Sequence, residues 1–150
     1  MKNVVRIALT AALLLTGAAA VAAGPTADEG KPAGAEFSIK ATPVKLTIDK
    51  AGNAVITIAA SPGFHWNKDY PAQAVVDGAD PKTVKVAKRE FKQLSGDFEA
   101  TETTATVKIP VVGKAAGEEQ LTVNARFSVC NESMCLIKKA SVEVPLAVAK

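Results

Sequence analysis

The stretch LTVNARFSV, residues 121–129, alternates apolar and polar side chains without interruption. Its apolar members fall on one side of an extended chain and its polar members on the other. Such a period of two places one side against a core and the other in water, as in an antiparallel sheet. We therefore predict a long β-strand here. Val129 is in the apolar phase, so we expect Cys130 on the opposite side, close to solvent.

The same period of two recurs along the chain from residue 36 onward. Turn-forming sequences rich in Gly, Pro, Asp and Asn separate the alternating stretches, and no segment shows a helical period over ten residues. About seven short strands in roughly 115 residues predict an all-β, immunoglobulin-like antiparallel β-sandwich. The apolar positions of the other predicted strands are Phe37 and Ile39; Val44, Leu46 and Ile48; Ile56 and Ile58; Val84 and Val86; Ala105, Val107 and Ile109; and Val142, Val144, Leu146 and Val148.

The N-terminal region has the organisation of an export signal. Residues 1–23 carry Lys2 and Arg6, then an apolar stretch built on Ala and Leu, and end in small residues suited to a signal peptidase. The apolar centre is about 14 residues long, shorter than a membrane span requires. We expect a cleaved signal peptide over 1–23, a flexible leader over 24–35 and one domain over 36–150. The mature protein is then periplasmic, soluble and not membrane-spanning, in a compartment where disulfides form.

The charge balance argues against a nucleic-acid partner. The chain has 18 basic and 15 acidic residues. Lys2 and Arg6 belong to the expected signal peptide, so 16 basic residues remain in the mature chain. Nucleic-acid binding needs a clear basic surplus on the domain, so no nucleic acid is expected. The sequence also contains no glycine-rich phosphate loop, carboxylate pair or zinc-ligand spacing.

The two cysteines are the main chemical feature of the sequence. Cys130 and Cys135 are separated by four residues and should pair in an oxidising compartment. A ring of about six residues removes only ~2 kcal/mol of unfolded-chain entropy, so the bond is not needed to hold a domain of this size together. One interpretation is a labile, redox-active bond, and another is a passive clamp on the loop. A third is a Cu(I) site using both cysteines with Met134 and His65, because soft sulfur ligands suit that ion.

The segment from Leu121 to Leu146 resembles the cysteine-bearing region of the DsbD N-terminal domain family, the periplasmic domain of thiol:disulfide interchange proteins. The shared pattern is an alternating strand ending in Cys, a short loop, a second Cys, and a returning strand that ends here in Val144-Pro145-Leu146. Two upstream segments add to the resemblance: SPGFHWN at 61–67 followed by Tyr70-Pro71, and TVKIPV at 106–111. The resemblance covers roughly residues 36–148.

The resemblance implies an immunoglobulin-like module that relays reducing equivalents as a protein-disulfide reductase or interchange carrier. A membrane-embedded thiol reductant would supply electrons, and periplasmic thioredoxin-fold proteins would accept them. Cys130 and Cys135 would be the redox pair, with Cys135 forming the bond to the partner. The cysteines are themselves the redox centre, so neither a metal nor another cofactor is expected.

The resemblance also implies side chains that line or cover the cysteine pair. Phe91 or Phe98 is expected to supply an aromatic cap, and His65, Asn67 and Met134 are further candidates for the site. Two of these candidates have a simpler structural interpretation. A single His beside Trp66 and Tyr70 is commonly a packing or hydrogen-bonding residue, and Met134 is commonly a loop or core side chain. The alternative for the whole chain is a non-catalytic immunoglobulin-like binding domain whose disulfide is structural.

Overall fold

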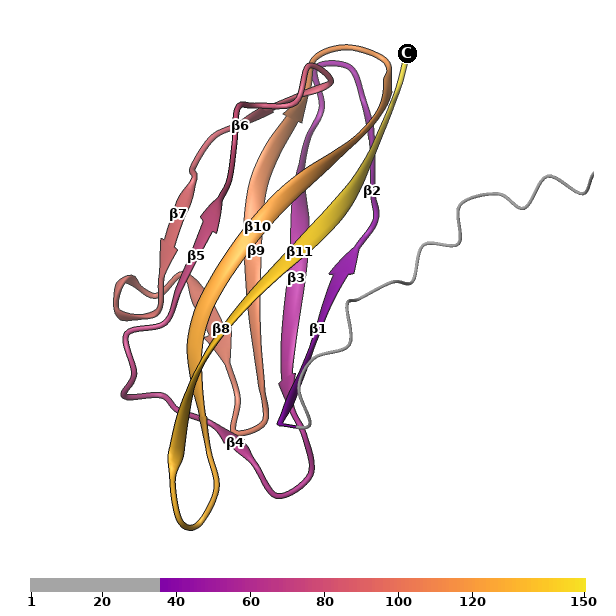
Figure 1. Cartoon of the computed structure of the whole chain (residues 1–150). Helices are drawn as coiled ribbons and strands as arrows, with labels where there is room; N and C mark the ends of the chain where they lie inside the picture. Colours follow the sequence, from indigo (N-terminus) through magenta and orange to yellow (C-terminus); the bar gives the residue numbers. More distant parts are fainter. Residues whose placement is uncertain (1–35) are drawn as a thin grey trace, which may run out of the picture.

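The computed structural model describes residues 36–150, which form an all-β sandwich of two sheets (Figure 1). The expected signal peptide, 1–23, and leader, 24–35, lie outside the described residues. The expected fold class, an immunoglobulin-like β-sandwich, is confirmed.

One layer is a five-stranded sheet. Its order is β1 (Phe37–Thr42), β3 (Ala51–Ala60), β9 (Thr104–Gly113) and β6 (Val84–Val86), and β8 (Phe98–Ala100) also pairs with β9. All pairings in this sheet are antiparallel.

The other layer is a six-stranded sheet. Its order is β2 (Val44–Thr47), β11 (Cys135–Ala149), β10 (Gly117–Cys130), β5 (Gln73–Val76) and β7 (Glu90–Lys92), and β4 (His65–Trp66) also pairs with β10. The 3-10 turn η1 (Gln93–Ser95) follows β7. β10 and β11 form a long hairpin that lies in front of β3 and β9, with its tip at the lower end of the view (Figure 1).

The predicted alternation matches the observed burial from Leu121 to Phe127 and ends there, because Ser128 on the outer face is also buried. Leu121, Val123, Ala125, Phe127 and Val129 are all buried, whereas Asn124 and Arg126 are exposed. One pairing departs from the antiparallel expectation, because β2 runs parallel to the end of β11. The chain leaves the five-stranded sheet after β1, passes through Pro43 and joins the six-stranded sheet as β2. Proline has no backbone N–H to donate to a ladder, which suits a point where a strand changes sheets.

An aromatic cluster fills the sandwich near the end that carries the hairpin tip. The Trp66 ring stacks on Phe127 with centroids 5.4 Å apart and on Phe98 at 6.1 Å, and Phe37 meets Phe127 edge-on at 4.9 Å. The indole N–H of Trp66 donates to Oε1 of Gln93 at 2.7 Å, so its polar atom is satisfied. The expectation that Trp66 is a core residue is confirmed.

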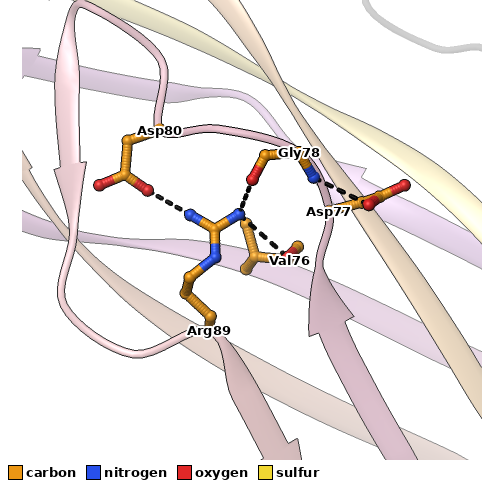
Figure 2. Close-up of polar contacts among 5 residues, drawn as sticks. All are labelled: Val76, Asp77, Gly78, Asp80 and Arg89. Carbon is orange, nitrogen blue, oxygen red and sulfur yellow. Dashed lines mark hydrogen bonds and ion pairs between the residues drawn. The ribbon is translucent and has the colours of Figure 1, made fainter.

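The loop between β5 and β6 is held by one arginine (Figure 2). The guanidinium of Arg89 donates to the carbonyl oxygens of Val76, at 3.1 Å, and Gly78, and it forms an ion pair with Asp80. Arg89 lies just before β7, so these contacts fix that loop against the sheet edge that β7 forms.

Candidate functional site

The β10–β11 hairpin carries both cysteines at its tip. Its register runs from Gly117 opposite Val148 to Cys130 opposite Cys135, and the two cysteines are disulfide-bonded with their Cα atoms 4.0 Å apart. The pairing expected from the sequence is therefore confirmed. The bond joins directly opposite residues on neighbouring strands and does not connect the two sheets.

The turn beyond the disulfide is closed by its own hydrogen bonds. The backbone N–H of Asn131 donates to the carbonyl oxygen of Met134 at 2.9 Å. The Asn131 side-chain oxygen accepts from the N–H groups of Ser133 and Met134, each at 2.9 Å. An Asn side chain that bonds the backbone two and three residues on stabilises a turn without help from sulfur.

The two cysteine residues differ sharply in exposure. Cys130 is only 5% exposed, whereas Cys135 is exposed. The expectation of a solvent-near Cys130 is therefore wrong. Its phase was predicted correctly, because Val129 faces the core and successive side chains point to opposite faces of a strand. β10 is an interior strand at this point, however, so Cys130 lies between Cys135 of β11 and His65 of β4.

Exposed apolar side chains flank the disulfide. Met134 precedes Cys135 and is 55% exposed, and Ile137 lies two residues further along β11 and is 57% exposed. Alternation along the strand puts Ile137 on the same outer face as Cys135. Single large apolar side chains are common on protein surfaces, but two near one exposed cysteine form a small apolar patch.

His65 and Asn67 reach the cysteine region from β4 and the loop after it. His65 is exposed and stands opposite Cys130 in the β4–β10 register. Asn67 is fixed against Ser128: its backbone N–H donates to the Ser128 carbonyl oxygen at 3.0 Å, and its side-chain N–H to the Ser128 hydroxyl at 3.4 Å. The structure thus brings His65 and Met134 next to the cysteine pair, whereas Asn67 lies two rows from it.

Phe91 and Phe98 lie in the core of the sandwich. Phe91 is 2% exposed on β7, and Phe98 is 8% exposed on β8, where it stacks on Trp66. The disulfide is on the outer face of the six-stranded sheet, so neither ring covers it in this conformation. The expectation of one cap loop carrying both residues is not met, because the segment contains the short strands β7 and β8, which belong to different sheets.

The set of soft ligands considered for Cu(I) is only partly assembled. Cys130, Cys135 and Met134 are together, and His65 is in the next strand. In this state the two cysteine sulfurs are bonded to each other and are not free to ligate. No cluster of three or more His, Cys, Asp or Glu side chains suited to a metal ion occurs within residues 36–150.

One ion pair braces the start of the domain against the hairpin. Lys138 lies on β11 near the cysteines, and its ammonium is 3.1 Å from a carboxylate oxygen of Glu36. The hydrogen bond from Lys138 holds the pKa of Glu36 below its ordinary value, and the backbone N–H of Glu36 itself acts in the same direction. Lys138 is therefore engaged with Glu36.

The strand that brings His65 to the disulfide has no signal in the sequence. β4 has two residues, too few for any periodicity to reveal it. The turn sequence Ser61-Pro62-Gly63 just before β4 predicts a turn at that point but gives no sign that a strand follows it.

Comparison with known proteins gives remote structural likenesses. No family model and no curated protein matches the chain. The chain is similar to AggA, the major subunit of aggregative adherence fimbriae type I from Escherichia coli, with 12% identity, coverage of 75% of this chain and 94% of that one, and a TM-score of 0.40.

Two further solved structures are remotely similar to this chain. The PapD-like domain 7 of human CEP192 is 8% identical, with 92% and 96% of the two chains covered and a TM-score of 0.35. The CooA pilin subunit of enterotoxigenic Escherichia coli is 11% identical, with 77% and 99% covered and a TM-score of 0.25. Likeness at this level carries no information about function.

The described region contains no membrane-spanning helix candidate. Within residues 36–150, no helix has the length and apolar character that crossing a bilayer requires.

Proposed function

We propose that this chain is an exported thiol–disulfide exchange module that relays two electrons at a time through Cys130 and Cys135. The observation that supports this most directly is the contrast between an exposed Cys135 and a buried Cys130 on the outer face of one sheet. An incoming thiolate has access to one residue of the pair, and the other is shielded from unintended partners.

The proposed exchange gives the two cysteines different roles. When the module is reduced by a donor, the donor thiolate attacks Sγ of Cys135, and the sulfur–sulfur bond breaks with Cys130 leaving as a thiolate. A second donor thiol then attacks the mixed disulfide and releases Cys135. When the reduced module acts on an acceptor, Cys135 attacks the acceptor disulfide, and Cys130 afterwards attacks Cys135 to re-form the bond and free the reduced acceptor.

The proposed partners are a membrane-embedded thiol reductant as donor and periplasmic thioredoxin-fold proteins as acceptors. The resemblance of Leu121–Leu146 to the DsbD N-terminal domain family is the basis for these partner classes. The exposed Met134 and Ile137 would supply apolar contact around the sulfur during each encounter. The periplasm is proposed because disulfides persist in oxidising compartments and because residues 1–23 have the composition of an export signal.

A second candidate is a non-catalytic immunoglobulin-like domain with a static disulfide. The burial of Cys130 favours it, because a thiolate attacking that sulfur has no open approach. The reduction potential distinguishes the two functions. A relay requires a value near those of thiol–disulfide exchange proteins, about −120 to −270 mV, whereas a static bond is expected below about −300 mV.

The single-cysteine variants test the relay directly. With an oxidised periplasmic thioredoxin-fold protein, Cys130→Ala leaves the exposed Cys135 thiol and should accumulate a mixed disulfide, detected as a reductant-sensitive band. Cys135→Ala leaves only the buried thiol and is the matched control, which should trap far less. Equal trapping by both variants would contradict the assignment of Cys135 as the attacking residue. Absence of trapping by both, with a potential below about −300 mV, would leave the static-disulfide function.

A further inference from the structure

His65, Cys130 and Cys135 form one row across three neighbouring strands. His65 is the register partner of Cys130 on one side, and Cys135 is its partner on the other. Residues opposite each other in adjacent strands project to the same face, with Cβ atoms about 4.5–5.5 Å apart. The imidazole therefore shares the outer face with the disulfide, on the side of Cys130 away from Cys135.

No structural contact accounts for the His65 side chain. Among residues 36–150 the imidazole makes no hydrogen bond and no ion pair, and the residue is exposed. The next side chain of β4, Trp66, supplies the core contact of that strand. The imidazole beside the disulfide is therefore available to act as an acid or a base.

Other ionisable groups near this row lie on the flanking loops. Glu132 is on the hairpin turn, and Lys68 and Asp69 follow β4. Glu102 is on the loop before β9, and its carbonyl oxygen accepts from the backbone N–H of Trp66. The outer-face positions of β10 and β11 in the two rows nearest His65 hold only cysteines, Ser128 and Ile137. Within the row itself, His65 is the only side chain besides the cysteines that can accept and donate a proton.

Exchange makes a specific demand on Cys130. Whenever the disulfide opens by attack on Cys135, the Cys130 sulfur departs as a thiolate at a position that is 5% exposed. Water cannot solvate that charge well, and burial disfavours a thiolate. A neighbouring imidazolium would stabilise the thiolate or give it a proton, and histidine changes charge between about pH 5 and pH 8.

We propose that His65 is the acid–base partner of Cys130, an inference that rests on the proposed exchange function. On opening, the donor thiolate bonds to Sγ of Cys135, the electron pair of the broken bond goes to Sγ of Cys130, and the imidazolium transfers its proton to that sulfur. On closing, neutral His65 takes the proton from the Cys130 thiol, and the resulting thiolate attacks Cys135 and expels the partner's thiolate. The proton and both electrons are accounted for in each direction.

The thiol ionisation of Cys130 tests this without any partner. In Cys135→Ser protein, thiolate absorbance at 240 nm is followed against pH with His65 intact and with His65→Gln. Loss of the imidazolium should move the thiolate midpoint upward by about one pH unit. Lys68→Gln removes a positive charge just outside the row and is the matched control, expected to have a smaller effect. Identical curves with and without His65 would overturn the proposal.

The kinetic test uses the intact disulfide and dithiothreitol as the thiol. His65→Gln should slow opening about tenfold near pH 7 and flatten the rate profile between pH 5 and pH 8, with unchanged circular dichroism. A rate profile unchanged by the substitution would contradict the inference. If the His65 effects on ionisation and rate appear but no protein partner is trapped, the relay function fails while the role of His65 stands.

Discussion

Tyr70 is the residue whose surroundings fit its chemistry least well. Its hydroxyl oxygen is buried and has no hydrogen-bond partner among the described residues. The aromatic ring is well placed, because the guanidinium of Arg126 lies 5.6 Å from its centroid and the ring packs against the core. A buried polar group without a partner costs about 1–3 kcal/mol, so the ring stabilises the fold and the hydroxyl opposes it.

Tyr70→Phe should therefore leave the free energy of unfolding unchanged or raise it by about 1 kcal/mol, as measured by urea denaturation. The substitution keeps the ring and its contact with Arg126 while removing the unpaired hydroxyl. Trp66→Phe gives the opposite control, because it removes the indole N–H bond to Gln93 and opens space in the aromatic cluster. A loss of more than about 1 kcal/mol in Tyr70→Phe would mean that the hydroxyl has a partner in solution.

The start of β10 is joined to the opposite sheet by one carboxylate. Oε2 of Glu119 accepts from the backbone N–H and the hydroxyl of Thr83, each at 2.7 Å, and Thr83 directly precedes β6 of the five-stranded sheet. The backbone hydrogen bond, followed by the hydroxyl, holds the pKa of Glu119 below its ordinary value. A glutamate in the unfolded chain has a pKa of about 4.3.

Acidification should weaken this connection between β10 and β6. Because the folded pKa of Glu119 is lower than the unfolded one, its contribution is complete above the unfolded value and is lost as pH falls through the folded value. Glu119→Gln should thus reduce stability at pH 7 and show a smaller further loss between pH 5 and pH 3 than the parent. Glu118→Gln, at the exposed neighbouring position, is the control. Equal pH dependence in the parent and Glu119→Gln would contradict the argument.

Most of the strands could be predicted from the sequence, among them the short β2 and β6, whereas β4, β5, β7 and β8 could not. β1, β3, β9, β10 and β11 each present enough alternating residues to show which face is buried. β4, β7 and β8 have two or three residues, and long-range pairing with β10, β5 and β9 creates them, so no local pattern predicts them.

The candidate site likewise has features that depend on local sequence and features that depend on tertiary pairing. The cysteine pairing and the face of Cys130 follow from local spacing and phase, so both were predicted correctly. The burial of Cys130 depends on β4 pairing with β10 from 65 residues earlier in the chain, and the burial of Phe91 and Phe98 depends on their strands joining different sheets. These arrangements are tertiary, and a single sequence contains no direct signal for them.

Reduction of the disulfide should leave the whole molecule folded. The bond closes a ring of about six residues at one end of the sandwich, and chain-entropy arguments give it only ~2 kcal/mol of stability. The core and the remaining β10–β11 register are independent of it. With excess reductant, the urea midpoint should fall while the slope of the transition stays the same.

A relay has to remain folded in both redox states, so this measurement also bears on the proposed function. Cys130→Ala/Cys135→Ala protein is the control for effects of the reductant itself. Unfolding of the reduced protein at 25 °C in the absence of urea would indicate a structural disulfide.

The parallel pairing of β2 with β11 has a consequence for biogenesis. It joins residues 44–47 to residues 146–149. About 100 residues of chain separate the two strands, so they can pair only after that whole stretch has been made. A polypeptide emerging N-terminus first cannot complete its six-stranded layer until that last segment is available. Until then the chain remains without its final fold, and the proposed export would take place in that state.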